Sequence, residues 1–248
     1  NGNFSDFSVD NFNNVYAINA VSGAVVKYNA QGDSTGVYNN LKNYGKLSFI
    51  DASNPLKIIF YYKEYLTIVL TDRFLNVTGT INLRKSGILQ AACVAFSYDN
   101  NIWIYDDVNA KIKKIDNQGA VLFESNDFRF LPEPPVMPQT LIDDNNVLYL
   151  YDAQKGWYFF NYFGSLKQQF PFAHWQNVHV SNNLLEGNDS FFLYTYHIPQ
   201  YQLDTVHTNL PLHQILKLEE QNEKWYALLP DGIAIYEASK EPYTKVLP

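Results

Sequence analysis

Histidine is the residue type in this chain that most directly suggests metal or acid–base chemistry, because imidazole binds divalent metals and titrates near neutral pH. All five histidines fall in one stretch, at His174, His179, His197, His207 and His213. Only His179 and His213 lie near the first strands of two adjacent repeat units, which are described below. A metal held by these two would need carboxylates from other units, and no His-Glu-x-x-His or paired Cys/His spacing is present. We therefore expect ordinary surface and packing histidines and no cofactor. The alternative is one divalent metal ion in a central channel.

Acidic residues recur at the ends of apolar segments, at Asp10, Asp51, Asp99, Asp143 and Glu219. A carboxylate in this position opens a turn and accepts hydrogen bonds from backbone N–H groups. A metal or substrate ligand would be needed in one or a few units, whereas these acids occur in nearly every unit. No Gly-x-Ser-x-Gly, Ser-x-x-Lys or phosphate-binding glycine-rich loop is present, and Cys93 lies in an apolar run. We predict turn-forming acids, a buried Cys93 and no catalytic residue.

Three irregular segments carry the side chains best suited to binding a partner. One is a proline-rich connection at residues 131–138, and the other two combine aromatic residues with Pro and His at residues 170–175 and 196–201. Loops on a rigid scaffold commonly carry function, and aromatic side chains dominate many binding surfaces. The candidate contact residues are Glu133, Pro134, Pro135, Phe172, Trp175, Tyr196 and Tyr201. The expected partner is another protein, and a glycan bound on platforms such as Trp175 and Tyr201 is the alternative.

An internal repeat must position these residues. The distance from an Asn that precedes an alternating apolar strand to a turn Gly is 18 in three copies: Asn14 to Gly32, Asn101 to Gly119 and Asn146 to Gly164. These copies start 87 and 45 residues apart, which leaves room for a weaker unit between the first two. Two further units follow. Each unit reads as four short strands, because side chains alternate with a period of two between Asn, Asp and Gly turns.

Six units of four strands predict one domain over residues 1–248, an all-β, six-bladed β-propeller with four-stranded antiparallel blades and almost no helix. The expected blades are approximately residues 1–43, 44–88, 89–130, 131–173, 174–211 and 212–248. Segment 244–247 reads as the fourth strand of the last blade. Ring closure is then expected from contact of the chain ends or from a small strand exchange.

The unit at residues 99–119 resembles an NHL repeat. It begins Asp99-Asn100-Asn101, continues through an alternating apolar strand to Asp106, and ends with Asp116 and Gly119. The units at 10–40 and 143–171 show the same pattern less completely. This resemblance implies a six-bladed propeller that binds a partner, since most NHL-type propellers do so and a few are enzymes. Fold-level similarity does not by itself identify an activity.

Composition limits the classes of partner. Of 248 residues, 46% are hydrophobic and only 17% are charged, against roughly 25% in an average protein. The net charge is −7, so we expect no nucleic-acid partner, which would require a basic surface. No apolar run approaches the roughly 18 residues of a membrane-spanning helix, so we expect a chain that does not span a membrane.

Together these observations predict a non-catalytic protein-binding or scaffold propeller. The low charge and the abundant Asn and Tyr favour an exported bacterial protein, periplasmic or on the cell surface, from which a signal sequence has been removed. An assembly in the bacterial envelope is the expected setting. The alternative function is a lactonase-like hydrolase or lyase that uses a divalent metal in the channel, with His179 and His213 as ligands.

Overall fold

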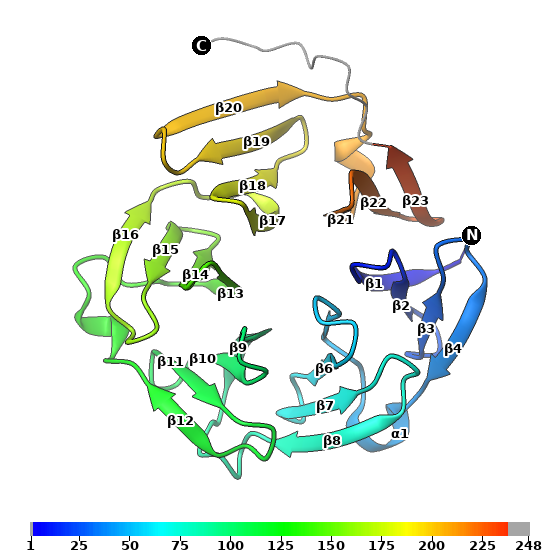
Figure 1. The fold of residues 1–248 in the computed structure, drawn as a ribbon, viewed down its shortest axis with the longest axis horizontal. Coiled ribbons are helices and arrows are strands. Elements are labelled where there is room, and N and C mark those ends of the chain that lie inside the picture. Colours follow the sequence, from blue (N-terminus) through cyan, green and yellow to red (C-terminus); the bar gives the residue numbers. More distant parts are fainter. Residues whose placement is uncertain (1, 238–248) are drawn as a thin grey trace.

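The computed structural model describes residues 2–237, and these form six antiparallel sheets arranged radially around a central axis (Figure 1). Five sheets have four strands in sequential order, and the last has three among the described residues. The predicted all-β, six-bladed propeller is therefore confirmed. The predicted strand at 244–247 lies outside the described residues.

The strands of blades 1 to 3 are β1 (Phe4–Val9), β2 (Val15–Asn19), β3 (Val25–Tyr28), β4 (Ser34–Tyr38), β5 (Phe49–Asp51), β6 (Ile58–Tyr62), β7 (Thr67–Thr71), β8 (Val77–Asn82), β9 (Ala91–Phe96), β10 (Ile102–Asp106), β11 (Lys111–Ile115) and β12 (Val121–Glu124). Those of blades 4 to 6 are β13 (Pro138–Asp144), β14 (Val147–Asp152), β15 (Gly156–Phe160), β16 (Leu166–Phe170), β17 (Gln176–Ser181), β18 (Leu184–Asn188), β19 (Phe192–His197), β20 (Gln202–His207), β21 (Lys217–Gln221), β22 (Lys224–Leu229) and β23 (Gly232–Glu237).

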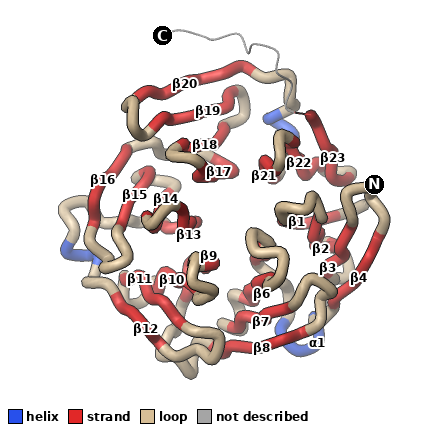
Figure 2. Tube along the Cα trace, in the orientation of Figure 1, coloured by secondary structure: helices blue, strands red, loops and turns tan. Residues whose placement is uncertain are grey.

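Helical structure among the described residues is limited to three short elements that lie in the connections between blades (Figure 2). These are α1 (Leu41–Tyr44) and the 3₁₀ turns η1 (Phe128–Phe130) and η2 (Leu212–Gln214). None of the helices in residues 2–237 is long and apolar enough to cross a membrane.

The antiparallel order gives the ring two distinct faces. Turns between first and second strands, and between third and fourth strands, lie on one face, which we call the turn face. Residues 97–101 and 161–165 are examples. Turns between second and third strands share the opposite face with the links between blades, such as residues 125–137. We call this the connection face.

The hydrophobic core lies between adjacent blades. Strands β6, β7, β10 and β15 are buried along their whole length, as expected for strands covered on both sides, and β14 is buried except at Val147. Between blades 3 and 4, Cys93 and Trp103 pack in one cluster with Tyr158 and Phe160. Cys93 is thus a buried hydrophobe, as predicted, and burial raises the pKa of its thiol far above the ordinary value.

The acids at the ends of the first strands do more than open turns. Asp10 fits the prediction, since its Oδ1 accepts hydrogen bonds from the backbone N–H groups of Phe12 and Asn14. Asp51, Asp143 and Glu219 also reach a neighbouring blade. Asp51 accepts from the N–H of Phe96 at 3.1 Å. The inner carboxylates therefore tie blades together, a role that the sequence analysis did not predict.

Ring closure within the described residues depends on side chains that join blade 6 to blade 1. Glu219 Oε2 accepts a hydrogen bond from the backbone N–H of Val9 at 2.9 Å. Lys217 Nζ donates to Asp6 Oδ1 at 2.8 Å and to the carbonyl oxygen of Phe7 at 2.6 Å. This half-buried cation with two carboxylates spans the junction between the first and last inner strands.

Candidate functional site

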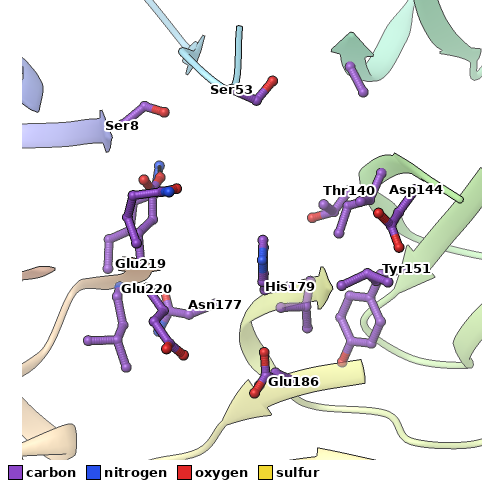
Figure 3. Close-up of a pocket in the computed structure, with 18 of the residues that line it drawn as sticks. Ser8, Ser53, Thr140, Asp144, Tyr151, Asn177, His179, Glu186, Glu219 and Glu220 are labelled. Atoms are coloured by element: carbon purple, nitrogen blue, oxygen red, sulfur yellow. Dashed lines mark hydrogen bonds and ion pairs between the residues drawn. The ribbon is translucent and has the colours of Figure 1, made fainter. Parts of the chain in front are cut away.

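A cavity of about 1090 Å³ lies on the propeller axis and is lined by the first strands of all six blades. Its residues include Ser8, Asp51, Ser97, Thr140, Asp144, Asn177, His179, Glu186, Lys217, Glu219 and Glu220. They are spread along the inner strands, with Ser8, Asp51 and Asp144 at the turn-face end and Asn177 and Lys217 at the opposite end. Figure 3 shows side chains from several blades converging on this space. A large concave site with convergent polar groups is the usual form of a small-molecule site.

His179 is the histidine that projects into the middle of the cavity (Figure 3). It lies on β17 and remains accessible to solvent in the cavity. Desolvation nevertheless lowers the pKa of its imidazole below 6.5, and the negative charge of Asp144 on β13 opposes this shift. The imidazole is therefore mainly neutral at pH 7.

Glu186 on β18 is the cross-strand neighbour of His179. Burial raises the pKa of its carboxyl to about 7, and the nearby Glu220 carboxylate adds to the shift. A carboxyl group and an imidazole that both favour their uncharged forms thus lie side by side in the cavity wall. Such perturbed groups mark candidate functional sites.

An irregularity in β17 gives His179 this position. The pairing with β18 shifts between Gln176 and His179, and Asn177 has a φ of 49°. The Asn177 side chain is held on both sides: its Oδ1 accepts from the N–H of Leu218 at 3.0 Å, and its Nδ2 donates to Asn188 Oδ1 at 2.8 Å. The bulge therefore ties β17 to blade 6, and Asn tolerates the left-handed conformation that it requires.

The donor groups do not fit the two-histidine metal site of the alternative hypothesis. His213 lies on η2, is exposed, and does not line the cavity that contains His179. Its Nε2 contacts Gln214 Nε2 at 3.1 Å. Residues 2–237 contain no group of three or more His, Cys, Asp or Glu side chains placed to hold a metal ion.

The proline-rich connection crosses the connection face between blades 3 and 4. Glu133, Pro134 and Pro135 lie at or near the surface. The backbone on either side of the two prolines is fixed: the Tyr158 hydroxyl donates to the Glu133 carbonyl at 3.0 Å, and Asp152 Oδ2 accepts from the N–H groups of Val136 and Met137.

This connection also presents apolar side chains that the sequence analysis did not select. Phe130 is 88% exposed, Val136 58% and Met137 49%. We call these three residues the connection patch. The segment beside Phe130 packs on the turn between β10 and β11, where the Phe128 N–H donates to the Ala110 carbonyl at 2.8 Å. Proline spacing predicted the stiff loop, but exposure of its apolar side chains depends on tertiary structure.

The other predicted contact residues separate into two groups. Phe172, Trp175 and Tyr196 come together in an aromatic cluster, where Phe172 stacks on Trp175 with ring centroids 5.2 Å apart. Trp175 and Tyr196 are buried there, so in the isolated chain they serve packing. Tyr201, in the turn between β19 and β20, is exposed and has a φ of 55°. The structure does not place Tyr201 in the cavity wall or in the connection patch.

No protein-family model matches the chain, so the resemblance to NHL repeats is not supported by a family model. No curated protein sequence matches it either.

Solved structures, in contrast, show clear similarity. A streptogramin B lyase matches with a TM-score of 0.66 and 13% identity over 92% of this chain and 77% of the lyase. A catalytically inactive virginiamycin B lyase from Staphylococcus aureus, crystallised with quinupristin, matches with a TM-score of 0.65 and 13% identity over 97% of this chain and 85% of the lyase. A protein of unknown function from Bacteroides caccae matches with a TM-score of 0.60 and 13% identity over 87% of this chain and 86% of that protein. At such identities the similarity establishes the propeller fold alone.

Proposed function

We propose that the chain is a non-catalytic protein-binding propeller that docks another protein on the connection patch. The observation that carries the proposal is the exposure of Phe130, Val136 and Met137 on a backbone that the fold holds in place. Several large apolar side chains exposed on one short connection are typical of a protein interaction site. The proline-rich connection is the same loop that its composition selected.

The rigid backbone of the proline-rich connection supports the proposal that a protein docks there. The backbone amides of Val136 and Met137 are bound by Asp152, a fully buried carboxylate, and the Glu133 carbonyl is bound by the buried Tyr158. Docking on a segment that is already ordered loses little conformational entropy, which favours affinity. The two prolines, Pro134 and Pro135, further restrict the loop.

Charged groups border the connection patch, as at many protein interfaces. Arg129 forms an ion pair with Asp127, and Lys155 lies 3.9 Å from Glu133. An apolar centre with a polar rim is the common anatomy of a protein–protein interface. Exposed ion pairs of this kind contribute little affinity and mainly influence orientation and association rate.

A photo-crosslinking experiment tests the proposal. A benzoylphenylalanine placed at position 130 reports on the connection patch. The same group at position 163 is the matched control, because Phe163 is 83% exposed in a turn on the opposite face. We expect one discrete crosslinked protein from position 130 in the native host, absent from position 163. Equal crosslinking from both positions, or none from position 130, would contradict the proposed surface.

We further propose that the partner lies in the bacterial envelope or exterior, within a larger assembly. The low charged fraction and the single buried cysteine, which needs no disulfide partner, suit that setting. Fractionation of the native host with antibody against the chain tests the location. Recovery with periplasmic or surface markers is expected, and recovery with cytoplasmic markers would overturn this part of the proposal.

A further inference from the structure

The turn-face side of the cavity carries an exposed aromatic ring that the proposed function does not use. Tyr98, in the turn after β9, lines the cavity and is 70% exposed. Its ring stacks on Tyr162 with centroids 5.2 Å apart and an interplanar angle of 6°. Because Tyr162 covers one face of the ring, the exposed area is that of the other face and the edge.

Neighbouring groups hold this ring in place. The backbone N–H of Tyr98 donates to Asp143 Oδ2 at 3.3 Å, and the Tyr162 hydroxyl donates to the other oxygen of the same carboxylate. Lys114 Nζ lies 5.2 Å from the centroid of Tyr98 and 5.4 Å from that of Tyr162, and it is paired with Asp99 at 2.6 Å. The turn therefore presents a fixed, flat aromatic platform.

Amide groups lie beside Tyr98 in the cavity lining. Asn54 Nδ2 donates to Asn100 Oδ1 at 3.2 Å, and Lys57 Nζ donates to the Asn100 carbonyl at 2.6 Å. Asn54 and Asn100 both line the cavity and come from different blades. The lining also supplies further amides and hydroxyls, from Ser53, Gln139, Thr140, Gln176, Thr195 and Gln221.

Several charged groups of the cavity are already paired with protein groups. Lys217 pairs with Asp6 and Glu219, and His197 pairs with Asp204 at 3.2 Å. The Asp51 carboxylate accepts from the N–H of Phe96, and the Asp143 carboxylate accepts from Trp103 Nε1 at 2.8 Å.

The remaining carboxyl and imidazole groups of the lining have shifted pKa values. Burial raises the pKa values of Asp144, Glu186 and Glu220 and lowers that of His179. The cavity thus offers both donors and acceptors of hydrogen bonds, and its carboxylates can accept from hydroxyl groups.

We propose that this cavity binds a neutral saccharide, with a sugar ring stacked on Tyr98 and its hydroxyl groups bound by the amides and hydroxyls of the lining. A pyranose has a flat C–H face that suits an aromatic ring, and its hydroxyl groups can donate hydrogen bonds to carboxylates and accept them from amides. The volume of about 1090 Å³ accommodates several sugar rings, since drug-sized ligands fill about 300–1,000 Å³. This site faces away from the connection patch, so it stands independently of the proposed protein partner.

Isothermal titration calorimetry of the purified chain with chitohexaose, cellohexaose and maltohexaose tests the inference. We expect at least one of these sugars to bind wild type. Tyr98→Ala should weaken that binding about tenfold, as loss of a good stacking contact predicts. Tyr98→Phe should leave it unchanged, because the platform and not its hydroxyl is used. The matched control is Tyr201→Ala, whose side chain is also 70% exposed but lies outside the cavity.

Three outcomes would overturn the inference. The first is no heat of binding for any of the three sugars up to millimolar concentration. The second is that Tyr201→Ala loses sugar binding while Tyr98→Ala keeps it, which would assign the stacking contact to another turn. The third is binding of an uncharged peptide, such as (Asn-Gly)₃ acetylated at its N-terminus and amidated at its C-terminus, with no sugar bound, which would assign the cavity to a peptide.

Discussion

Removing the Asp143 carboxylate should destabilise the propeller more than loss of a turn-forming acid would. This side chain accepts hydrogen bonds from Trp103 Nε1 at 2.8 Å and from Ser97 Oγ at 2.9 Å, both on blade 3, although Asp143 belongs to blade 4. Trp103 and Ser97 are buried, so water cannot readily replace the lost acceptor. An orphaned buried donor costs about 1–3 kcal/mol. We therefore expect Asp143→Ala to lower the free energy of unfolding by about 3–5 kcal/mol.

Urea denaturation followed by circular dichroism measures this loss, with Asp116→Ala as the control. Asp116 accepts from the N–H groups of Gln118 and Ala120 in an exposed turn, so its loss should cost only about 1 kcal/mol. The cause is tested in a Trp103→Phe background, which has no indole N–H to orphan. There the cost of Asp143→Ala should fall by about 1–3 kcal/mol. A cost below about 1 kcal/mol in wild type, or an unchanged cost in Trp103→Phe, would refute the reasoning.

Two further predictions concern the cavity and a backbone contact. The Glu186 carboxyl, whose pKa of about 7 exceeds its usual 4.5, binds a proton more tightly in the folded state, so stability should fall as pH rises from 4.5 to 7. Glu186→Gln should remove this loss of stability, so the variant should be more stable than wild type by about 2–3 kcal/mol at pH 8. Urea denaturation at pH 5 and pH 8 measures the difference. Equal free energies of unfolding at pH 8 would contradict the prediction. Gly156→Ala should cost about 3 kcal/mol or more, because its Cβ would lie 2.2 Å from the Phe170 carbonyl oxygen. Gly32→Ala, also at positive φ but with open space around it, should cost only about 1 kcal/mol in the same denaturation assay, and equal losses in the two variants would show that the contact is unimportant.

The blades could be predicted because the contacts that define their turns join residues close together in the sequence. In the turns between third and fourth strands, Asn29 and Asp116 accept hydrogen bonds from nearby backbone N–H groups. Gly32 and Gly119 supply φ values of 87° and 88°. These contacts join residues no more than four positions apart, so the Asn-to-Gly spacing identifies them without knowledge of the ring.

The site was less predictable because it depends on contacts between distant residues. Asp143 reads as a turn acid, yet its partner Trp103 is 40 positions away. Trp175 resembles an exposed loop aromatic, but Gly187 leaves room for it, since a Cβ there would lie 3.0 Å from the indole ring. His213 precedes a first strand, but the turn η2, whose Leu212 is buried, places it away from the cavity. The raised pKa of Glu186 depends on burial and on Glu220 of the adjacent blade, which lies 34 positions away in the sequence.

The measurement that tests the central claim most directly is the affinity of the protein crosslinked from position 130 for the purified chain. Biolayer interferometry compares wild type with a Phe130→Ser/Val136→Ser double variant and with Phe163→Ser. All three substitutions replace exposed side chains, so the fold should be retained. We predict that the double variant weakens binding about a hundredfold, since loss of interface anchors costs about 2 kcal/mol or more, while Phe163→Ser binds as wild type does. Unchanged affinity of the double variant would contradict docking on the connection patch.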